Sequence, residues 1–212
     1  MNKKPIICFE GPSGIGKTTM GKLLSEDFYI VPEVNFLFER KAEEPELWYH
    51  ERQVERYEMC CMSNRVSILD GDIFQPVWYN WACNYPTKFL SKEETHRFYK
   101  SMLEQGKINF PDLYIIFYVD ESELWVRKEN DKSRQRRNFE KHLTIIEPLK
   151  EYWRFLESDT DIELRFVHYK DIASTMDIVL SHIDQVKFKT IDSMNTFDLI
   201  ENWIDAKRKS GI

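Results

Sequence analysis

The sequence predicts a three-layer α/β fold, in which a doubly wound parallel sheet carries helices on both of its faces. Short apolar runs without alternating polar residues indicate strands that are buried on both faces, as in a parallel sheet. Segments with the helical spacing of apolar residues separate these runs, which is the pattern of successive βαβ units. The 212 residues contain no repeat, low-complexity tract or linker-like stretch, so we expect a single domain over residues 1–212.

The expected elements alternate along the chain. Strands are predicted over residues 5–9, 29–34, 66–69, 111–120 and 163–169. Helices are predicted over residues 17–27, 46–64, 92–105, 122–128, 138–157 and 174–183. Ser91 and Glu94 predict a capping box at the start of the third of these helices. In a C-terminal extension near residues 186–212, we expect an added strand over 186–191 and a helix over 196–208 that turns Phe197, Ile200, Trp203 and Ile204 inward.

Composition excludes several classes of protein. Hydrophobic residues make up 42% of the chain and aromatic residues 14%, which excludes a disordered protein. No apolar run approaches the roughly 20 residues of a membrane span, so we expect no membrane partner. The net charge of −6 disfavours a nucleic-acid partner. The four cysteines lack metal-binding spacing, and we expect them to be the reduced thiols of a cytoplasmic protein.

A phosphate-binding motif follows the first expected strand. Residues 11–18 match G-x-x-x-x-G-K-[ST] in full and read Gly11, Pro12, Ser13, Gly14, Ile15, Gly16, Lys17 and Thr18. Glycines are needed there because backbone N–H groups must curl around phosphate oxygens, and the helix that follows adds its positive end. Lys17 can reach the β- and γ-phosphates, and the Thr18 hydroxyl can ligate Mg²⁺.

The motif therefore predicts a site for a nucleoside triphosphate with Mg²⁺, and we include the adjoining Thr19 among its residues. ATP is the expected donor, although the motif does not distinguish it from GTP.

A basic stretch interrupts this acidic chain at residues 127–137. It holds six Lys and Arg residues against two acidic ones. Phosphoryl transfer spreads charge over the equatorial oxygens, which the planar fork of arginine neutralises well. We expect Arg134, Arg136 and Arg137 to be catalytic and residues 127–138 to form a mobile lid over the triphosphate. The alternative is a solvated basic face at a helix end.

Three blocks of the chain resemble the P-loop deoxynucleoside kinases and thymidylate kinases. Residues 9–19 are similar to the opening of thymidylate kinases. The Val-Pro-Glu-Val stretch at 31–34 resembles the second-strand motif of deoxynucleoside kinases. Residues 111–120, with Glu123 and Arg127, resemble the fourth strand of these kinases and the helix after it.

The resemblance implies a P-loop kinase fold and a set of functional residues. It implies that Glu33 acts as base toward the nucleoside 5′-hydroxyl, and that Phe36, Trp48 and Tyr57 contact the acceptor. It also places the arginines of residues 134–137 in the lid, and it leaves a homodimer open as the assembly.

One departure from these families follows the third expected strand. The resemblance predicts an arginine there, in an Asp-Arg or Glu-Arg-Ser motif, but this chain has Asp70, Gly71 and Asp72. Active groups gather at the carboxyl ends of strands in open α/β sheets, so both aspartates are candidate catalytic residues and Asp72 is also a candidate acceptor contact. The alternative for both is the chemistry of a strand-end turn.

These observations predict a kinase that transfers the γ-phosphate of ATP to a small-molecule acceptor, with a nucleoside or nucleotide as first choice. Because the expected arginine is missing, an antibiotic-modifying or other small-molecule P-loop phosphotransferase stays open. A GTPase-like switch or an ATP-dependent regulatory module is disfavoured. The chain lacks both an Asp-x-x-Gly switch after the third strand and a base-reading Asn/Thr-Lys-x-Asp motif.

Overall fold

The described residues form a sheet of five parallel strands in the order β2-β3-β1-β4-β5. The computed structural model describes residues 4–41, 43–83, 90–130, 139–188 and 190–209 of the chain. The strands are β1 (Ile6–Glu10), β2 (Tyr29–Val31), β3 (Ser67–Asp70), β4 (Leu113–Tyr118) and β5 (Leu164–His168). Central β1 is fully buried and pairs with β3 on one side and β4 on the other.

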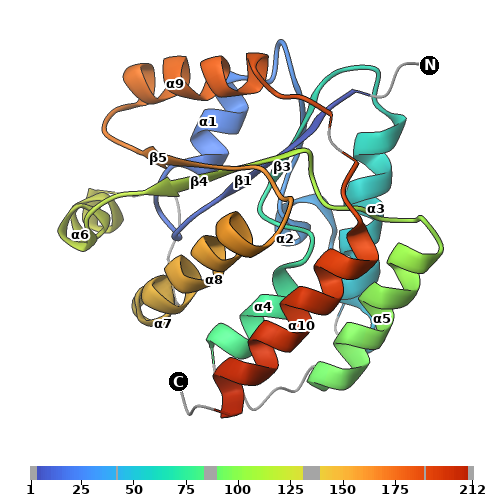
Figure 1. The fold of residues 1–212 in the computed structure, drawn as a ribbon. Coiled ribbons are helices and arrows are strands. Elements are labelled where there is room, and N and C mark those ends of the chain that lie inside the picture. Colours follow the sequence, from blue (N-terminus) through green and yellow to red (C-terminus); the bar gives the residue numbers. More distant parts are fainter. Residues whose placement is uncertain (1–3, 42, 84–89, 131–138, 189, 210–212) are drawn as a thin grey trace.

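Helices cover both faces of this sheet (Figure 1). One face is covered by α1 (Lys17–Leu23) and α9 (Ile172–Asp184). The opposite face carries α3 (Trp48–Met62), α4 (Gln75–Ala82), α5 (Lys92–Glu104), α8 (Ile146–Asp159) and α10 (Ser193–Lys209). The remaining described helices are α2 (Val34–Leu37), α6 (Glu121–Asn130) and α7 (Phe139–Thr144). The predicted three-layer, doubly wound α/β class is confirmed.

Each layer boundary holds its own apolar core. On the α1 and α9 side, Met20, Leu24 and Val179 pack against the sheet. On the other side the core is larger and rich in aromatic rings, with Phe74 stacked on Phe110 at a centroid distance of 4.3 Å. This aromatic core packs beneath residues of α3, α4 and α8 that line a cleft.

Most predicted elements are present, and the capping box of Ser91 and Glu94 is confirmed at the start of α5. The helix expected over 138–157 is wrong in one respect, because it is two helices that meet at Ile145. Pro148 explains the break. It has no N–H to donate to the carbonyl of Thr144, which is the last residue of α7.

Two other expectations are corrected, and one helix is additional. The strand expected over 29–34 ends at Val31, and Glu33 is already the N-cap of α2. No described residue of the segment 186–191 lies in a strand; the Val186 N–H instead donates to the Ile183 carbonyl at the end of α9. Helix α4 was not expected, because its Trp- and Tyr-rich sequence carries little of the usual polar face.

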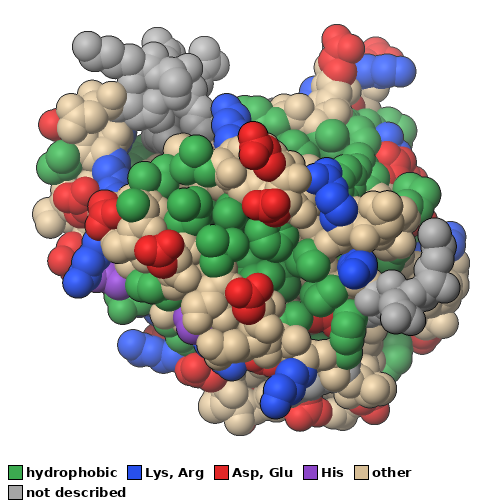
Figure 2. Space-filling model, turned by 90° about the horizontal axis from the view of Figure 1, so that it is seen from above, with side chains coloured by type: hydrophobic (Ala, Val, Ile, Leu, Met, Phe, Trp, Pro, Cys, Tyr) green, Lys and Arg blue, Asp and Glu red, His purple; other side chains and the backbone are tan. Residues whose placement is uncertain are grey.

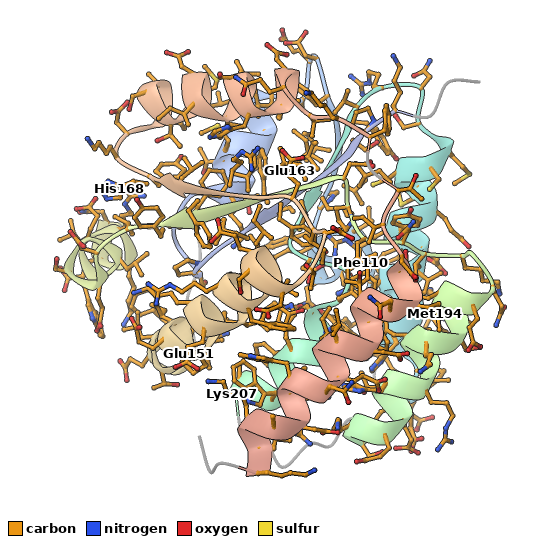
Figure 3. All side chains as sticks on the ribbon, viewed as in Figure 1. Phe110, Glu151, Glu163, His168, Met194 and Lys207 are labelled. Carbon is orange, nitrogen blue, oxygen red and sulfur yellow. The ribbon has the colours of Figure 1, made fainter. Side chains whose placement is uncertain are left out.

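Helix α10 lies along α5 and α4 and closes the lower layer (Figure 1). Phe197, Ile200 and Ile204 are buried as predicted. Trp203 is partly buried and stacks on Phe155 with a centroid distance of 4.9 Å. Lys207 of α10 donates to Glu151 of α8 at 2.6 Å, and the two labelled side chains face each other in Figure 3.

The outer face seen in Figure 2 exposes apolar side chains between acidic ones. Leu23 of α1 and Ile178 of α9 are among the exposed apolar residues, with 53% and 45% of their surface accessible. Among the described helices, none combines the length and the apolar character that crossing a membrane requires.

Candidate active site

A cleft of about 1030 Å³ opens at the carboxyl ends of β1, β3 and β4. Residues of the loop between β1 and α1 form one part of its wall. We call these residues, together with Asp70, the donor half of the cleft. Residues of α2, α3, α4 and α8 form another part, which we call the acceptor half. Crevices at this edge of an open α/β sheet are the usual ligand sites of such folds.

The loop of the donor half depends on glycine at two positions. Gly11 has φ +141°, and a Cβ there would lie 2.4 Å from the Phe117 carbonyl oxygen. Gly16 has φ +117°, and its Cβ would lie 2.8 Å from the ring of Tyr169. Both sites exclude any larger residue, so the backbone keeps the tight curve that an oxyanion cradle needs.

Pro12, Ser13, Gly14, Gly16, Lys17 and Thr18 also line the cleft. Ile15 instead points into the core, with 1% of its surface accessible, and Thr19 is exposed outside the cleft lining. The Lys17 ammonium donates to the Gly11 carbonyl at 2.8 Å, across the mouth of the loop.

The pair of Thr18 and Asp70 fits a magnesium ion. The Thr18 hydroxyl donates to Asp70 Oδ2 at 2.7 Å, and Asp70 Oδ1 is buried without a partner among the described residues. The described chain offers no group of three or more His, Cys, Asp or Glu side chains that would bind a metal by themselves. Two oxygen ligands suit Mg²⁺, which keeps several waters and takes others from substrate phosphates.

Glu10 links the donor half to the end of β3. Its carboxylate accepts from the Gly11 N–H at 2.8 Å and from the Asp72 N–H at 3.0 Å. Burial raises the pKa of Glu10 from 4.5 to about 7, although nearby Lys17 and the two N–H groups pull it down. This buried carboxyl fixes the phosphate loop relative to the β3 turn.

Asp72 lies below the cleft and outside its lining. Its carboxylate accepts from Trp78 Nε1 at 2.9 Å, from the Tyr114 hydroxyl at 3.1 Å and from the Phe74 N–H at 3.1 Å. Burial raises the pKa of Asp72, and these bonds oppose the rise. The predicted catalytic and acceptor-contact roles of Asp72 stay untested, and its contacts describe a residue that holds Trp78 in place.

Glu33 lines the cleft at the start of α2. A Cβ on Gly71 would lie 3.6 Å from Glu33 Cγ and 4.0 Å from Glu10 Oε2, so the β3 turn and Glu33 are direct neighbours. The Glu33 carboxylate forms no hydrogen bond or ion pair with any described residue. The Glu33 carboxylate is therefore available in the cleft for its predicted role as a base.

The three predicted acceptor contacts lie in different places. Phe36 lines the cleft, with 56% of its surface accessible. Trp48 lines a second, smaller hollow, where the guanidinium groups of Arg40 and Arg52 lie over its ring. Tyr57 is buried in the aromatic core, with 5% accessible. The cleft thus brings only Phe36 of these three together with Glu33.

Sequence reasoning missed several residues of the acceptor half. Its wall also includes Tyr49, His50, Arg56, Gln75, Trp78, Tyr79 and Trp153. The Tyr49 hydroxyl donates to Gln75 Oε1 at 2.7 Å, which joins α3 to α4, and burial raises the pKa of Tyr49 to about 12. The excess of aromatic residues in the sequence is a signal for Tyr49, Trp78, Tyr79 and Trp153, and nothing in the sequence signals His50, Arg56 or Gln75.

Arg127 does not reach into the cleft. Its guanidinium donates to the Ile15 carbonyl at 2.8 Å and the Tyr169 carbonyl at 2.9 Å, and it lies over the Tyr169 ring. It therefore ties the phosphate loop to the segment after β5. The predicted lid arginines Arg134, Arg136 and Arg137 lie outside the described residues.

Solved structures that share this fold include kinases of nucleosides and nucleotides. A thymidylate kinase from Candida albicans aligns with a TM-score of 0.61 over 90% of this chain and 97% of its own, at 15% identity. A deoxyadenosine kinase from M. mycoides, solved with bound dATP, aligns with a TM-score of 0.59 over 85% of this chain and 100% of its own, also at 15% identity.

The chain has the fold of these kinases. This confirms the predicted fold and the structural side of the resemblance. No family model matches the chain, and no curated protein sequence matches it.

Proposed function

We propose that this protein is a kinase that transfers the γ-phosphate of ATP to a hydroxyl group of a nucleoside. The observation that carries this proposal is the Glu33 carboxylate, which lines the same cleft as the phosphate loop and is bonded to no described residue. A phosphate cradle and an available base in one cleft are the parts that phosphoryl transfer to an alcohol requires.

The reaction assigns a task to each of these groups. The acceptor hydroxyl oxygen forms a bond to the γ-phosphorus as the bond from that phosphorus to the β–γ bridging oxygen breaks, which releases ADP. Glu33 takes the hydroxyl proton as the oxygen attacks. Lys17 and the N–H groups of the loop stabilise the charge on the phosphate oxygens. When Mg²⁺ is bound, Thr18 and Asp70 would hold it, and it would neutralise further phosphate charge.

A hydroxyl acceptor fits this site better than a phosphate acceptor. A phosphate monoester already carries an anionic oxygen and needs no base, and the Glu33 carboxylate would repel it. The β3 turn also offers glycine at position 71 rather than an arginine that would bind a phosphate.

The acceptor half suits a nucleoside base. Flat rings of Phe36, Tyr79 and Trp153 border it, and aromatic faces bind planar heterocycles by stacking. Gln75 accepts from Tyr49, so its amide nitrogen stays available to donate to a base edge. The thymidylate and deoxyadenosine kinases of the same fold add support, since both are named for acceptors that carry a base.

The test is ADP release with a panel of acceptors in the presence of ATP and Mg²⁺. The panel contains deoxynucleosides, thymidine monophosphate and hydroxylated antibiotics. With the best nucleoside, Glu33→Gln is expected to lower kcat by about 10²-fold with little change in ATP affinity, as for loss of a general base.

Glu157→Gln is the matched control, because Glu157 also lines the cleft but lies on α8. It is expected to retain near-normal kcat. Turnover of an antibiotic or a monophosphate in preference to every nucleoside would overturn the acceptor assignment, and normal kcat in Glu33→Gln would overturn the base.

A further inference from the structure

Arg56 of α3 is a buried cation with unusual partners. Only 1% of its surface is accessible, although arginine is rarely buried to this degree without an anion. Its Nη1 donates to Gln53 Oε1 at 2.6 Å, and its Nη2 donates to the carbonyls of Asp70 and Gly71 at 2.7 and 3.0 Å. The Nε–H is also buried, and it has no partner among the described residues.

All three partners of Arg56 are neutral. No described carboxylate lies close enough to form an ion pair with it, although Asp72 feels its field from farther away. A buried charge without an adjacent opposite charge is costly, and arginine cannot escape the cost by losing its proton. An unmet N–H donor adds to that cost. Such an arrangement is expected where a ligand completes the set of partners.

The position of Arg56 shows which ligand atom it can reach. Arg56 lines the cleft, and the two carbonyls that it binds belong to the turn after β3. Gly71 of this turn packs against Glu33, since a Cβ on Gly71 would lie 3.6 Å from Glu33 Cγ. Arg56, Glu33 and Tyr49 all line this same cleft.

We infer that the Nε–H of Arg56 holds the attacking hydroxyl oxygen of the acceptor beside Glu33. This inference rests on the proposed function. The hydroxyl would donate its proton to Glu33 and accept a hydrogen bond from Arg56, which leaves its other lone pair directed at the γ-phosphorus. The Arg56 guanidinium thus reaches the β3 turn from helix α3. The turn itself has Gly71 where the resemblance predicted an arginine.

The test removes first the 5′-hydroxyl of the nucleoside and then the Nε–H of Arg56. Binding of deoxyadenosine and of thymidine is measured by calorimetry in the presence of a non-hydrolysable ATP analogue, together with analogues that carry hydrogen in place of the 5′-hydroxyl. The native protein is expected to bind the better nucleoside at least ~10-fold more tightly than its analogue, as for a hydrogen bond to a charged group. Arg56→Lys keeps the charge but lacks the Nε–H, and it is expected to lose about 10-fold of this discrimination.

Arg52→Lys is the matched control on the same helix. Arg52 pairs with Glu55 and lines the smaller hollow instead of the cleft, so its variant is expected to discriminate like the native protein. Arg56→Gln, checked for folding by its melting temperature, gives a second measurement without the charge. Full discrimination in a folded Arg56→Lys would overturn the inference alone. Equal binding of both nucleosides and their analogues by the native protein would likewise overturn the inference, whereas binding of neither nucleoside would mean that the proposed function itself is wrong.

Discussion

The donor and acceptor halves of the cleft hold their polar groups in different ways. In the donor half, the groups come from the phosphate loop and from the end of β3 and bond to one another, as when Lys17 donates to Gly11 and Thr18 donates to Asp70, although Asp70 Oδ1 lacks a described partner. In the acceptor half, Glu33, His50 and Arg56 come from separate parts of α2 and α3, and each keeps an atom without a described partner.

This difference separates groups that the protein itself holds in place from groups whose hydrogen-bonding atoms a ligand would complete. The Lys17–Gly11 and Thr18–Asp70 hydrogen bonds hold these donor-half groups in place before any nucleotide binds. Acceptor-half groups leave donors and acceptors unmet at a cost in stability, which a ligand would remove. We therefore expect substitutions in the donor half to act on turnover. Substitutions that disturb the buried contacts beneath the acceptor half, such as those of Asp72 with Trp78 and Tyr114, are expected to act mainly on stability.

The largest effect is expected from Lys17→Ala in the donor half. It should lower kcat by at least about 10³-fold, because the ammonium that stabilises charge on the transferred phosphate is lost. The melting temperature should change little, since Lys17 contributes one described hydrogen bond to the fold. Lys22→Ala, an exposed lysine of the same helix, serves as control and should be neutral. Retained turnover in folded Lys17→Ala would reject the phosphate-loop assignment.

Intermediate effects, on turnover in one case and on stability in the other, are expected from substitution of Asp70 and of Asp72, which lie two residues apart. Asp70→Asn should lower kcat by about 10²-fold and leave the free energy of unfolding nearly unchanged, because Asp70 faces the cleft. Asp72→Asn should lower the free energy of unfolding by about 2 kcal/mol, because it disturbs buried bonds to Trp78 and Tyr114.

Steady-state kinetics and urea unfolding of both variants make this comparison. A loss of turnover in Asp72→Asn with no loss of stability would instead support the catalytic role that the sequence suggested for it.

The donor half was predictable from sequence because its chemistry is local. A contiguous motif between an apolar strand and a helix specifies the glycines at 11 and 16, the lysine and the threonine. The parallel sheet was predictable for a similar reason, since residues 113–118 are apolar throughout, which favours a strand buried on both faces; the structure buries all of them except Tyr118.

The acceptor half was not predictable, because its residues meet only in the folded chain. Arg56 lies among Glu51, Arg52, Glu55 and Glu58, a pattern typical of a solvated helix face. Its burial depends on where the β3 turn ends, which no local pattern shows. Helical spacing over residues 46–64 would also place Cys61 on one apolar side with Val54 and Tyr57, but of these three only Val54 and Tyr57 are buried in the structure. Helix α3 turns Gln53 and Arg56 toward the β3 turn and leaves Cys61 exposed.

The last expected effect is a pH dependence of stability that comes from His50. Burial lowers the pKa of His50 from 6.5 to about 4, and its Nε2 lies 3.2 Å from the Thr95 hydroxyl. The folded state therefore binds fewer protons than the unfolded state between these two values. Stability from this group is complete above pH 6.5 and is lost as the pH falls toward 4, by at most about 1.4 kcal/mol per pH unit.

Glu10 gives the opposite slope and so provides the control. Its folded pKa of about 7 exceeds the ordinary value of 4.5, so the folded state binds more protons and stability falls as the pH rises from 4.5 to 7. Urea unfolding of the native protein and of His50→Gln from pH 4.5 to 7.5 isolates the histidine, because the Glu10 contribution cancels in the difference. The native protein should lose stability relative to His50→Gln as the pH falls, and Glu10→Gln should show a difference of opposite sign. Parallel curves for the native protein and His50→Gln would mean that this histidine stays solvated and that the acceptor half is wetter than its contacts indicate.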